Sequence, residues 1–224
     1  VGNEFLVNTY TDSDQNKPSV FVLSDGGFVI TWESHDGQDG HRAGIFAQRY
    51  DENGNRVGGE AQVNAYSYSF QTDPEITGLD GGGFVMTWQS NIQDGDNYGI
   101  YAQIYGADGY RVGEEFQVNT YPTGSQMYPS ITALNDGGFV VTWHSDEQDG
   151  SGYGVYAQRY DAEGNALGEV TLNLPPELSS AISDASTNED AAYSYDASQN
   201  FSDVDVGDTL TYSTTFSNKL TVGP

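Results

Sequence analysis

Short runs dominated by apolar and β-branched residues follow one another along most of the chain, separated by Gly, Asp, Asn and Pro. One such run, from Phe28 to Trp32, is almost continuously apolar, which is typical of a strand that is covered on both faces. The residues between the runs are those that form turns. No stretch of useful length has helical periodicity. The pattern therefore predicts an all-β protein built from short antiparallel strands.

The same strand signals recur at a nearly constant period. The apolar run ends at Trp32, Trp88 and Trp143, and the phrase Gln-Asp-Gly follows each time. A third phrase, which reads Ile-Phe-Ala-Gln-Arg-Tyr in its first copy, then completes the period. Self-similarity of this kind is the signature of a repeat architecture. We expect one repeat domain over residues 1–173, with copies at about 1–56, 57–111 and 112–166 and a closing strand at 167–173.

Each copy contains four strand signals. In the second copy they cover residues 75–79, 84–90, 98–105 and 115–121. Four strands in a repeat of this size are typical of a propeller blade, so we expect antiparallel four-stranded repeats that are propeller-blade-like or stacked. Three copies leave three arrangements open: part of a larger ring, an open stack, or half of an assembly that a second chain completes.

The composition changes near residue 174. Two adjacent prolines, Pro175 and Pro176, indicate a stiff linker over residues 174–180. Beyond the linker the repeat is absent, and Ser, Thr, Asp and Tyr dominate residues 181–224. A segment of this size is marginal for an independent core, so we expect a partial β-sandwich there. Because the sequence opens at Val1 and stops at Pro224, we also expect it to be part of a longer polypeptide.

Charge and composition narrow the range of partners. Asp and Glu number 33 against 7 Lys and Arg, which gives a formal net charge of −26. Recognition of nucleic acid needs basic side chains to neutralise phosphates, and an anionic membrane surface repels so acidic a protein. No apolar run approaches the ~18–20 residues of a transmembrane helix. We therefore expect neither nucleic-acid binding nor membrane insertion. The chain has no Cys, which excludes disulfides and thiolate metal sites.

The repeated phrases Gly-Gly-Phe-Val-x-Thr-Trp and Gln-Asp-Gly resemble repeats of large secreted bacterial adhesins, including rhizobial adhering proteins and proteins with calcium-binding export-signal repeats. The C-terminal segment resembles the beginning of a bacterial cadherin-like domain, on Asn188-Glu189-Asp190 and on the run from Phe201 to Tyr212. The resemblance implies export by a one-step secretion route, an extracellular or cell-surface location and calcium-dependent folding outside the cell. It also implies adhesion to surface polysaccharide, as in biofilms.

Two groups of acidic residues are candidates for holding Ca²⁺, which takes about 6–8 oxygen ligands. The first group crowds carboxylates that would repel one another without a cation, and comprises Asp203, Asp205 and Asp208, with Glu189 to complete the shell. The second recurs in the loop after each Trp run, and comprises Asp36, Asp39, Asp94, Asp96, Asp146 and Asp149. Asp-Gly is also an ordinary turn dipeptide, so solvated acidic turns remain the alternative for both groups.

Tyrosines in the turn-rich segments are candidates for stacking on sugar rings, because an exposed Tyr offers an apolar face and a hydroxyl. The candidates are Tyr98, Tyr153, Tyr66, Tyr68 and Tyr128. An ordinary sheet surface uses Tyr as well, so that alternative stays open. Trp32, Trp88 and Trp143 lie in the most apolar runs, and we expect them in the core.

No catalytic motif is evident. The three histidines do not share a repeat position, and no Gly-x-Ser-x-Gly elbow is present. The leading hypothesis is a non-enzymatic, extracellular, calcium-dependent adhesion module that contacts a polysaccharide or glycan, or other copies of itself in a homo-oligomer. One rival is an accessory or catalytic part of a secreted polysaccharide-degrading enzyme, whose carboxylate pair depends on spatial separation. Another is a structural surface-layer or filament subunit.

Overall fold

The computed structural model describes residues 2–168, 177–178 and 201–202 of the chain, which divides into two compact units, Val1–Glu169 and Val170–Pro224. All regular structure in the described residues is β-sheet, which confirms the predicted fold class for them. None of these residues belongs to a helix long and apolar enough to cross a membrane. In the second unit the structure describes one short pair, β13 (Glu177–Leu178) with β14 (Phe201–Ser202). The cadherin-like segment otherwise lies outside the described residues.

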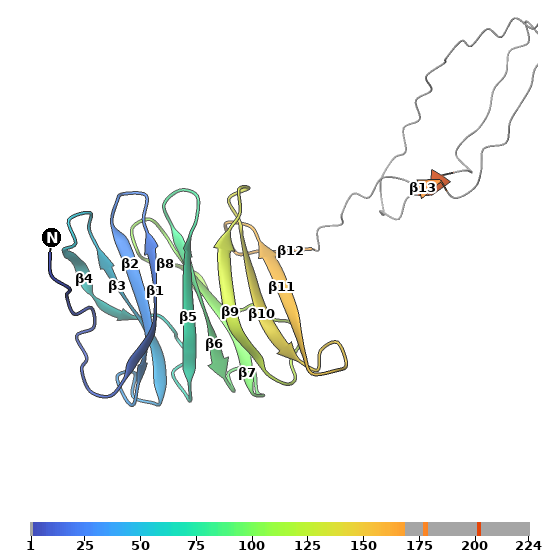
Figure 1. Cartoon of the computed structure of the whole chain (residues 1–224), viewed down its shortest axis with the longest axis horizontal. Coiled ribbons are helices and arrows are strands. Elements are labelled where there is room, and N and C mark those ends of the chain that lie inside the picture. The colour runs from blue at the N-terminus through green and yellow to red at the C-terminus, as the bar shows by residue number, and fades with distance from the viewer. Residues whose placement is uncertain (1, 169–176, 179–200, 203–224) are drawn as a thin grey trace, which may run out of the picture. The chain divides into compact units, whose positions relative to one another are not determined.

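The first unit consists of three antiparallel four-stranded sheets, which we call blades 1 to 3 (Figure 1). Blade 1 contains β1 (Gln15–Val22), β2 (Phe28–His35), β3 (Ala43–Tyr50) and β4 (Arg56–Gln62). Blade 2 contains β5 (Gln71–Gly78), β6 (Phe84–Asn91), β7 (Tyr98–Tyr105) and β8 (Arg111–Gln117). Blade 3 contains β9 (Gln126–Ala133), β10 (Phe139–Asp146), β11 (Tyr153–Tyr160) and β12 (Ala166–Leu167).

The strands of each blade are neighbours in the order in which the chain visits them. The fourth strand of the second copy differs from its predicted bounds of 115–121 and ends instead at Gln117. Beyond it, the Asn119 side chain accepts a hydrogen bond from the Ile100 amide at 2.7 Å, so a side chain replaces the strand ladder there. Of the closing strand expected at 167–173, the structure describes Leu167 and Gly168, and β12 ends at Leu167.

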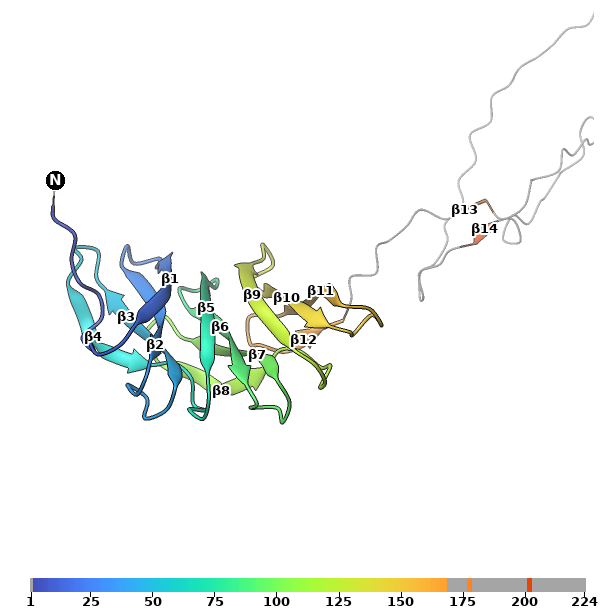
Figure 2. The same ribbon diagram turned by 60° about the horizontal axis from the view of Figure 1, so that its bottom comes forward.

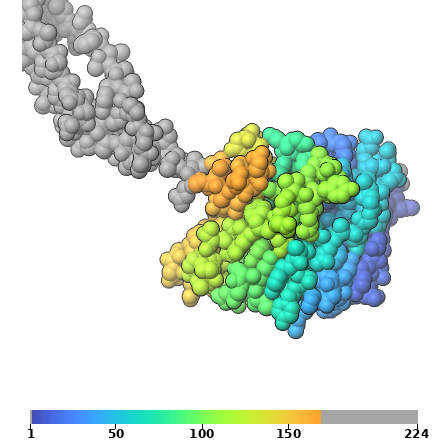
Figure 3. Space-filling model, turned by 180° about the vertical axis from the view of Figure 1, so that it is seen from behind, coloured from blue at the N-terminus to red at the C-terminus, as the bar shows by residue number. Residues whose placement is uncertain are grey.

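The blades follow one another with their innermost strands β1, β5 and β9 side by side, and Figure 2 shows this succession from a second direction. Seen from behind in Figure 3, the blades form successive packed bands from blue to orange. The arrangement is therefore propeller-like in its blades, each of which lays one sheet face on the next.

Two hydrophobic clusters join the blades in pairs, and each uses one face of each sheet. The face that a blade turns towards the next blade is called its leading face: Leu23, Val29, Ile45 and Val63 in blade 1, and Leu79, Val85, Ile100 and Val118 in blade 2. The face that receives it is called the trailing face: Ile76, Phe84, Met86, Trp88 and Tyr101 in blade 2, and Ile131, Phe139, Val141, Trp143 and Tyr156 in blade 3. The three Trp side chains are buried, as predicted.

Candidate functional site

Each innermost strand bulges at the same place. The register of β1, β5 and β9 slips there, and Lys17, Asp73 and Tyr128 adopt left-handed backbone with φ of 50°, 55° and 57°. In each case the next residue is proline, which cannot donate a ladder hydrogen bond and is tolerated at a bulge. A non-glycine residue in this conformation costs roughly 1–2 kcal/mol. The bulges therefore change the direction of the equivalent side chains in all three strands.

In blades 2 and 3, the backbone amide at the bulge donates a hydrogen bond to a side chain of the preceding blade. Glu33 accepts a hydrogen bond from the Asp73 amide at 3.0 Å, and Gln89 accepts one from the Tyr128 amide at 2.8 Å. Glu33 is only 5% exposed, and its second oxygen lies 3.1 Å from the His35 ring. A buried carboxylate is costly unless it is hydrogen-bonded, so these contacts stabilise Glu33 and the bulge together.

The bulges border a hollow of about 270 Å³. It is lined by Lys17, Pro18, Asp73, Pro74, Glu75, Tyr128 and Pro129, which come from all three innermost strands. Lys17 Nζ lies 2.6 Å from Asp73 Oδ1, and this hydrogen bond, with the charge of Asp73, raises the pKa of Lys17. Glu75 accepts a hydrogen bond from the Ser19 hydroxyl at 3.1 Å. The hollow thus offers both donors and acceptors, and its size approaches that of the smallest ligand pockets, about 300 Å³.

Exposed aromatic rings adjoin the hollow. Tyr128 lies edge-on to His144 with ring centroids 5.7 Å apart, and His144 lies 6.4 Å from Tyr153. Tyr128 is 55% exposed and Tyr153 is 59% exposed. We call Tyr128, His144 and Tyr153 the tyrosine–histidine patch. Tyr128 belongs to the patch and lines the hollow, so an apolar surface and a polar recess are continuous at this point.

The other predicted tyrosines occupy different surroundings. Tyr98 is half-buried, and burial raises its pKa, with the charges of Asp73 and Glu33 acting in the same direction. Tyr68 is exposed and contacts His41 edge-on, with centroids 5.6 Å apart. Tyr66 is half-buried, and its amide donates to Glu115. Sugar binding by these five tyrosines stays a prediction.

The recurring loop aspartates close their own turns. Asp39, Asp94 and Asp149 each accept a hydrogen bond from the amide two residues on, at 2.9, 3.3 and 3.1 Å. Each side chain also lies against the glycine near the start of the third strand, where an added Cβ would come within 2.7–2.9 Å of the carboxylate. For Asp94 burial raises the pKa. These contacts are those expected of turn residues.

The neighbouring acids make separate contacts. Asp36 accepts from the Ser13 hydroxyl, Asp96 accepts from the Gly124 amide, and Asp146 is half-exposed at the end of β10. Within the described part of the chain, no three or more His, Asp or Glu side chains gather as a metal site would require. The remaining metal candidates, Glu189, Asp203, Asp205 and Asp208, lie outside the described residues. The calcium cofactor stays a prediction.

Lys17 and Asp73, which line the hollow, and His144 of the patch were not predicted from the sequence. A signal was available, because Lys-Pro, Asp-Pro and Tyr-Pro stand at one place in each copy, at residues 17, 73 and 128. An unusual residue pair that recurs with the repeat marks a structural constraint, and here the constraint is the bulge.

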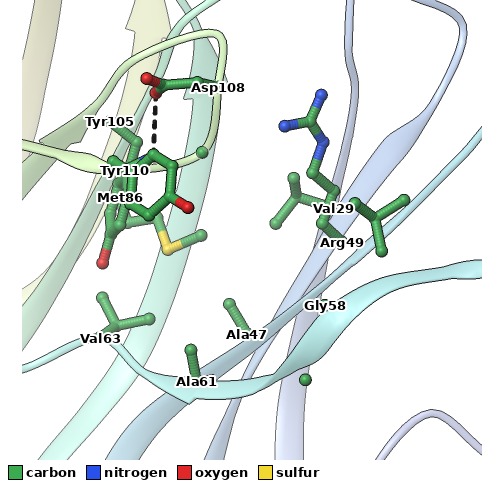
Figure 4. A pocket seen from close by; sticks show the side chains of 13 residues that line it. Val29, Ala47, Arg49, Gly58, Ala61, Val63, Met86, Tyr105, Asp108 and Tyr110 are labelled. Atoms are coloured by element: carbon green, nitrogen blue, oxygen red, sulfur yellow. Dashed lines mark hydrogen bonds between the residues drawn. The ribbon is translucent and has the colours of Figure 1, made fainter.

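A second cavity, of about 460 Å³, lies between blades 1 and 2, away from the bulges (Figure 4). Its inner wall is apolar and includes Val29, Ala61, Met86 and Tyr105. Asp108, whose carboxylate accepts from the Tyr110 amide at 3.0 Å, lies at its border. Few polar groups converge on this space, so it has the character of a packing gap between two sheets.

No family model matches the chain, and no characterised protein matches its sequence. Similar solved structures include a thermostable family-43 glycoside hydrolase (16% identity, 74% of this chain and 62% of that one, TM-score 0.48). An α-L-arabinofuranosidase from Lactobacillus brevis is 13% identical over 71% of this chain and 57% of that one, with a TM-score of 0.49. An endo-1,4-β-xylanase from Bacteroides thetaiotaomicron is 13% identical over 75% and 62%, with a TM-score of 0.44. The chain thus spans about three fifths of the length of these proteins.

These findings correct part of the sequence interpretation. The similar solved structures are glycoside hydrolases and not adhesin repeats, so the identification with adhesin repeats is contradicted. The themes of adhesion, biofilm and calcium binding find no support in these structures, and the predicted cadherin-like segment lies outside the described residues. The expectation of a non-enzyme is also contradicted, because those neighbours are enzymes. The physical reason is that Gly-Gly-Phe-Val-x-Thr-Trp specifies a hairpin and a buried strand. Such a phrase reports blade architecture, which proteins of different function share.

Proposed function

We propose that the three-blade unit is a carbohydrate-binding part of a secreted polysaccharide-degrading system. The observation that carries this proposal is the tyrosine–histidine patch, which is exposed and shares Tyr128 with a hollow lined by Lys17 and Asp73. Aromatic side chains with a polar tip bind ligands that have one apolar face and many hydroxyl groups. A few convergent polar groups beside such an apolar surface then orient the ligand.

The hollow and the patch would make different contacts with a sugar, polar in the hollow and aromatic at the patch. A single sugar ring fits the scale of the hollow, where the Asp73 and Glu75 carboxylates accept hydrogen bonds from hydroxyls and the Lys17 ammonium donates them. The Tyr128 ring borders that position, and Tyr153 extends the aromatic surface beyond it. A chain of sugars therefore has more than one contact point, which favours a polymer over a free monosaccharide.

A second candidate function is hydrolysis of the same polymer. Glycoside hydrolysis uses two carboxyl groups that flank the bond to be cleaved, and their different surroundings set the acid and base roles. Asp73 and Glu75 line the same hollow, but Asp73 is paired with Lys17, whereas Glu75 is hydrogen-bonded to the neutral Ser19 hydroxyl. This difference is the specific observation that favours a catalytic version of the site.

Binding is tested by calorimetry and affinity electrophoresis with xylan and arabinan, polymers chosen after the names of the similar structures. We expect retention of the wild-type protein by at least one polymer, and an affinity loss of about tenfold for Tyr128→Ala, as removal of one aromatic contact of about 1.4 kcal/mol gives. Tyr110→Ala is the matched control, because Tyr110 is 77% exposed on another hairpin. Wild-type protein that ignores a panel of polysaccharides would contradict the proposal, as would unchanged binding by Tyr128→Ala.

Hydrolysis is tested separately by release of reducing sugar from the polymer that binds. In a catalytic site, Asp73→Asn and Glu75→Gln should each lower the rate at saturating polymer by at least 10²-fold, the contribution of a general acid or base. Absence of release by the wild-type protein would remove the catalytic version and leave the binding proposal standing.

A further inference from the structure

Four side chains gather where the chain passes from blade 1 into blade 2. His41 and Arg42 end the loop between β2 and β3, and Tyr68 and Phe70 belong to the segment that leads into β5. The Tyr68 ring lies edge-on to His41 with centroids 5.6 Å apart, and the Arg42 guanidinium lies 5.3 Å from the centre of the Phe70 ring. We call these four residues the junction cluster. Aromatic contacts thus join a loop of one blade to the entry of the next.

The junction of blades 2 and 3 carries no aromatic or basic side chain at the equivalent positions, which are Asp96, Asn97, Thr123 and Ser125. The equivalence follows from shared hydrogen bonds. The His41 and Asp96 amides each donate to the aspartate two residues earlier. The Tyr68 and Thr123 carbonyls each accept from a buried glutamine of the innermost strand that follows. A junction between blades therefore forms without these side chains, so the packing of the blades does not require the cluster.

The junction cluster is open to solvent and has free hydrogen-bond donors. Tyr68 is 59% exposed, and His41 and Arg42 are exposed as well. Among the described residues, every other Lys or Arg side chain donates a hydrogen bond within the protein, whereas Arg42 donates none. Attraction to the Phe70 ring orients the guanidinium and leaves its N–H groups free. The cluster thus offers a ligand an aromatic surface beside oriented donors.

The junction cluster lies at the end of the blades that holds the hollow. Tyr68 precedes Asp73 by five residues, a backbone path of at most about 18 Å, and Asp73 lines the hollow. The tyrosine–histidine patch, in contrast, belongs wholly to blade 3. One aromatic surface therefore approaches the hollow from blade 3, and a second approaches it from the junction of blades 1 and 2.

We propose that the junction cluster is a second sugar subsite of the same polymer-binding surface, an inference that rests on the proposed function. The Tyr68 ring packs against the apolar face of a sugar unit outside the hollow, and Arg42 donates hydrogen bonds to the hydroxyl groups of that unit. Two subsites raise the affinity of a ligand well beyond that of either subsite alone, provided that the ligand spans both. The protein therefore prefers long chains to short oligosaccharides of the same sugar.

The test is calorimetry with the polymer that binds the wild-type protein and with its oligosaccharides, from the disaccharide to the octasaccharide. We expect the affinity to rise with length until both subsites are occupied. Tyr68→Ala should lower the affinity for the polymer and the octasaccharide about tenfold and leave that for the disaccharide unchanged. Tyr128→Ala should weaken ligands of every length. Thr123→Ala, at the equivalent position between blades 2 and 3, is the matched control and should bind like the wild type.

A second variant, Arg42→Ala, leaves the segment around Tyr68 intact and should also weaken the long ligands alone. Circular dichroism and melting temperature establish that each variant is folded. Polymer binding that is weakened by Tyr128→Ala but unchanged by Tyr68→Ala and Arg42→Ala would overturn the second subsite and leave the proposed function standing. Equal losses for the disaccharide and the octasaccharide would overturn it as well. A wild-type protein that binds no polysaccharide would overturn both the subsite and the proposed function.

Discussion

The two interfaces between blades use the same positions but fill them differently. At the junction of blades 2 and 3, Phe116 packs against Tyr160 with ring centroids 5.5 Å apart. At the junction of blades 1 and 2, Ala61 and Tyr105 are the equivalent residues, and both line the cavity of about 460 Å³ (Figure 4). The apolar contents of an interface can therefore differ by the volume of a phenyl ring without changing how the blades stack.

The hydrogen bonds between consecutive blades, in contrast, are present at both interfaces. Glu33 holds the bulge at Asp73 and Gln89 holds the bulge at Tyr128, although one acceptor is charged and the other neutral. Both interfaces thus keep the same hydrogen bond from a bulge amide while their apolar filling differs, which favours a role of the hydrogen bond, more than of the apolar volume, in the register between blades.

The largest difference between the interfaces should appear on removing their central tyrosines. Tyr160 is 3% exposed and stacks on Phe139, with centroids 5.0 Å apart, so Tyr160→Ala should lower the free energy of unfolding by about 3–5 kcal/mol. Tyr105→Ala should cost about 1–2 kcal/mol less, because the cavity already removes part of the Tyr105 packing. Urea denaturation measures both values, and equal losses would contradict the assigned difference in packing.

Removal of the Phe116 ring from the junction of blades 2 and 3 should have the next largest effect on stability. Phe116→Ala should lower the free energy of unfolding by about 2–4 kcal/mol, since it creates at blades 2 and 3 the gap that exists at blades 1 and 2. Phe116→Leu is the matched control and should cost about 1 kcal/mol. If Phe116→Ala lowered the free energy of unfolding by less than Phe116→Leu does, Phe116 would not be a packing residue.

Closing the open interface should have the opposite sign. Ala61→Phe supplies the ring that Phe116 provides at the other junction, and cavity filling commonly adds about 0.5–2 kcal/mol of stability. Differential scanning calorimetry should show a higher melting temperature. Destabilisation instead would mean that the cavity is shaped against an inserted ring.

The ion pair at the hollow should give the smallest effect. Contact with Asp73 raises the pKa of Lys17, so the pair stabilises the folded state below the ordinary Lys pKa of 10.5, and this contribution is lost as pH rises through the higher folded value. Lys17 is largely exposed, and screening reduces the contribution to about 0.5 kcal/mol or less. The melting temperatures of wild type and Lys17→Met should therefore differ slightly at pH 7 and converge above pH 10.5. A gap that widens with pH would contradict the assignment.

Particular residues show what the sequence could and could not predict. The Trp spacing and the hairpin phrases predicted the three sheets, because strand alternation and turn chemistry act over a few residues. The bulges at Lys17, Asp73 and Tyr128 were not predicted, because left-handed backbone is rare for such residues and depends on acceptors supplied by another blade.

Two aromatic members of the candidate site, Tyr128 and Tyr153, were among the residues singled out from the sequence, and their sugar binding stays a prediction. They were chosen because they lie in turn-rich segments, whereas the hollow depends on three innermost strands lying together, which is a tertiary event. The adhesin identification failed for a related reason. Phrases that specify a blade are read in the sequence, but the chemistry resides in side chains that the stacking of blades brings together.

The hollow draws its walls from three different sheets, and no single blade contains it. Its shape therefore exists only while consecutive sheets keep their mutual spacing. A saccharide bound there would bridge the sheets as a removable cross-link and resist their fanning apart, so occupancy should raise the melting temperature with the logarithm of the sugar concentration. Sugar binding and the stability of the packed blades would then be thermodynamically linked.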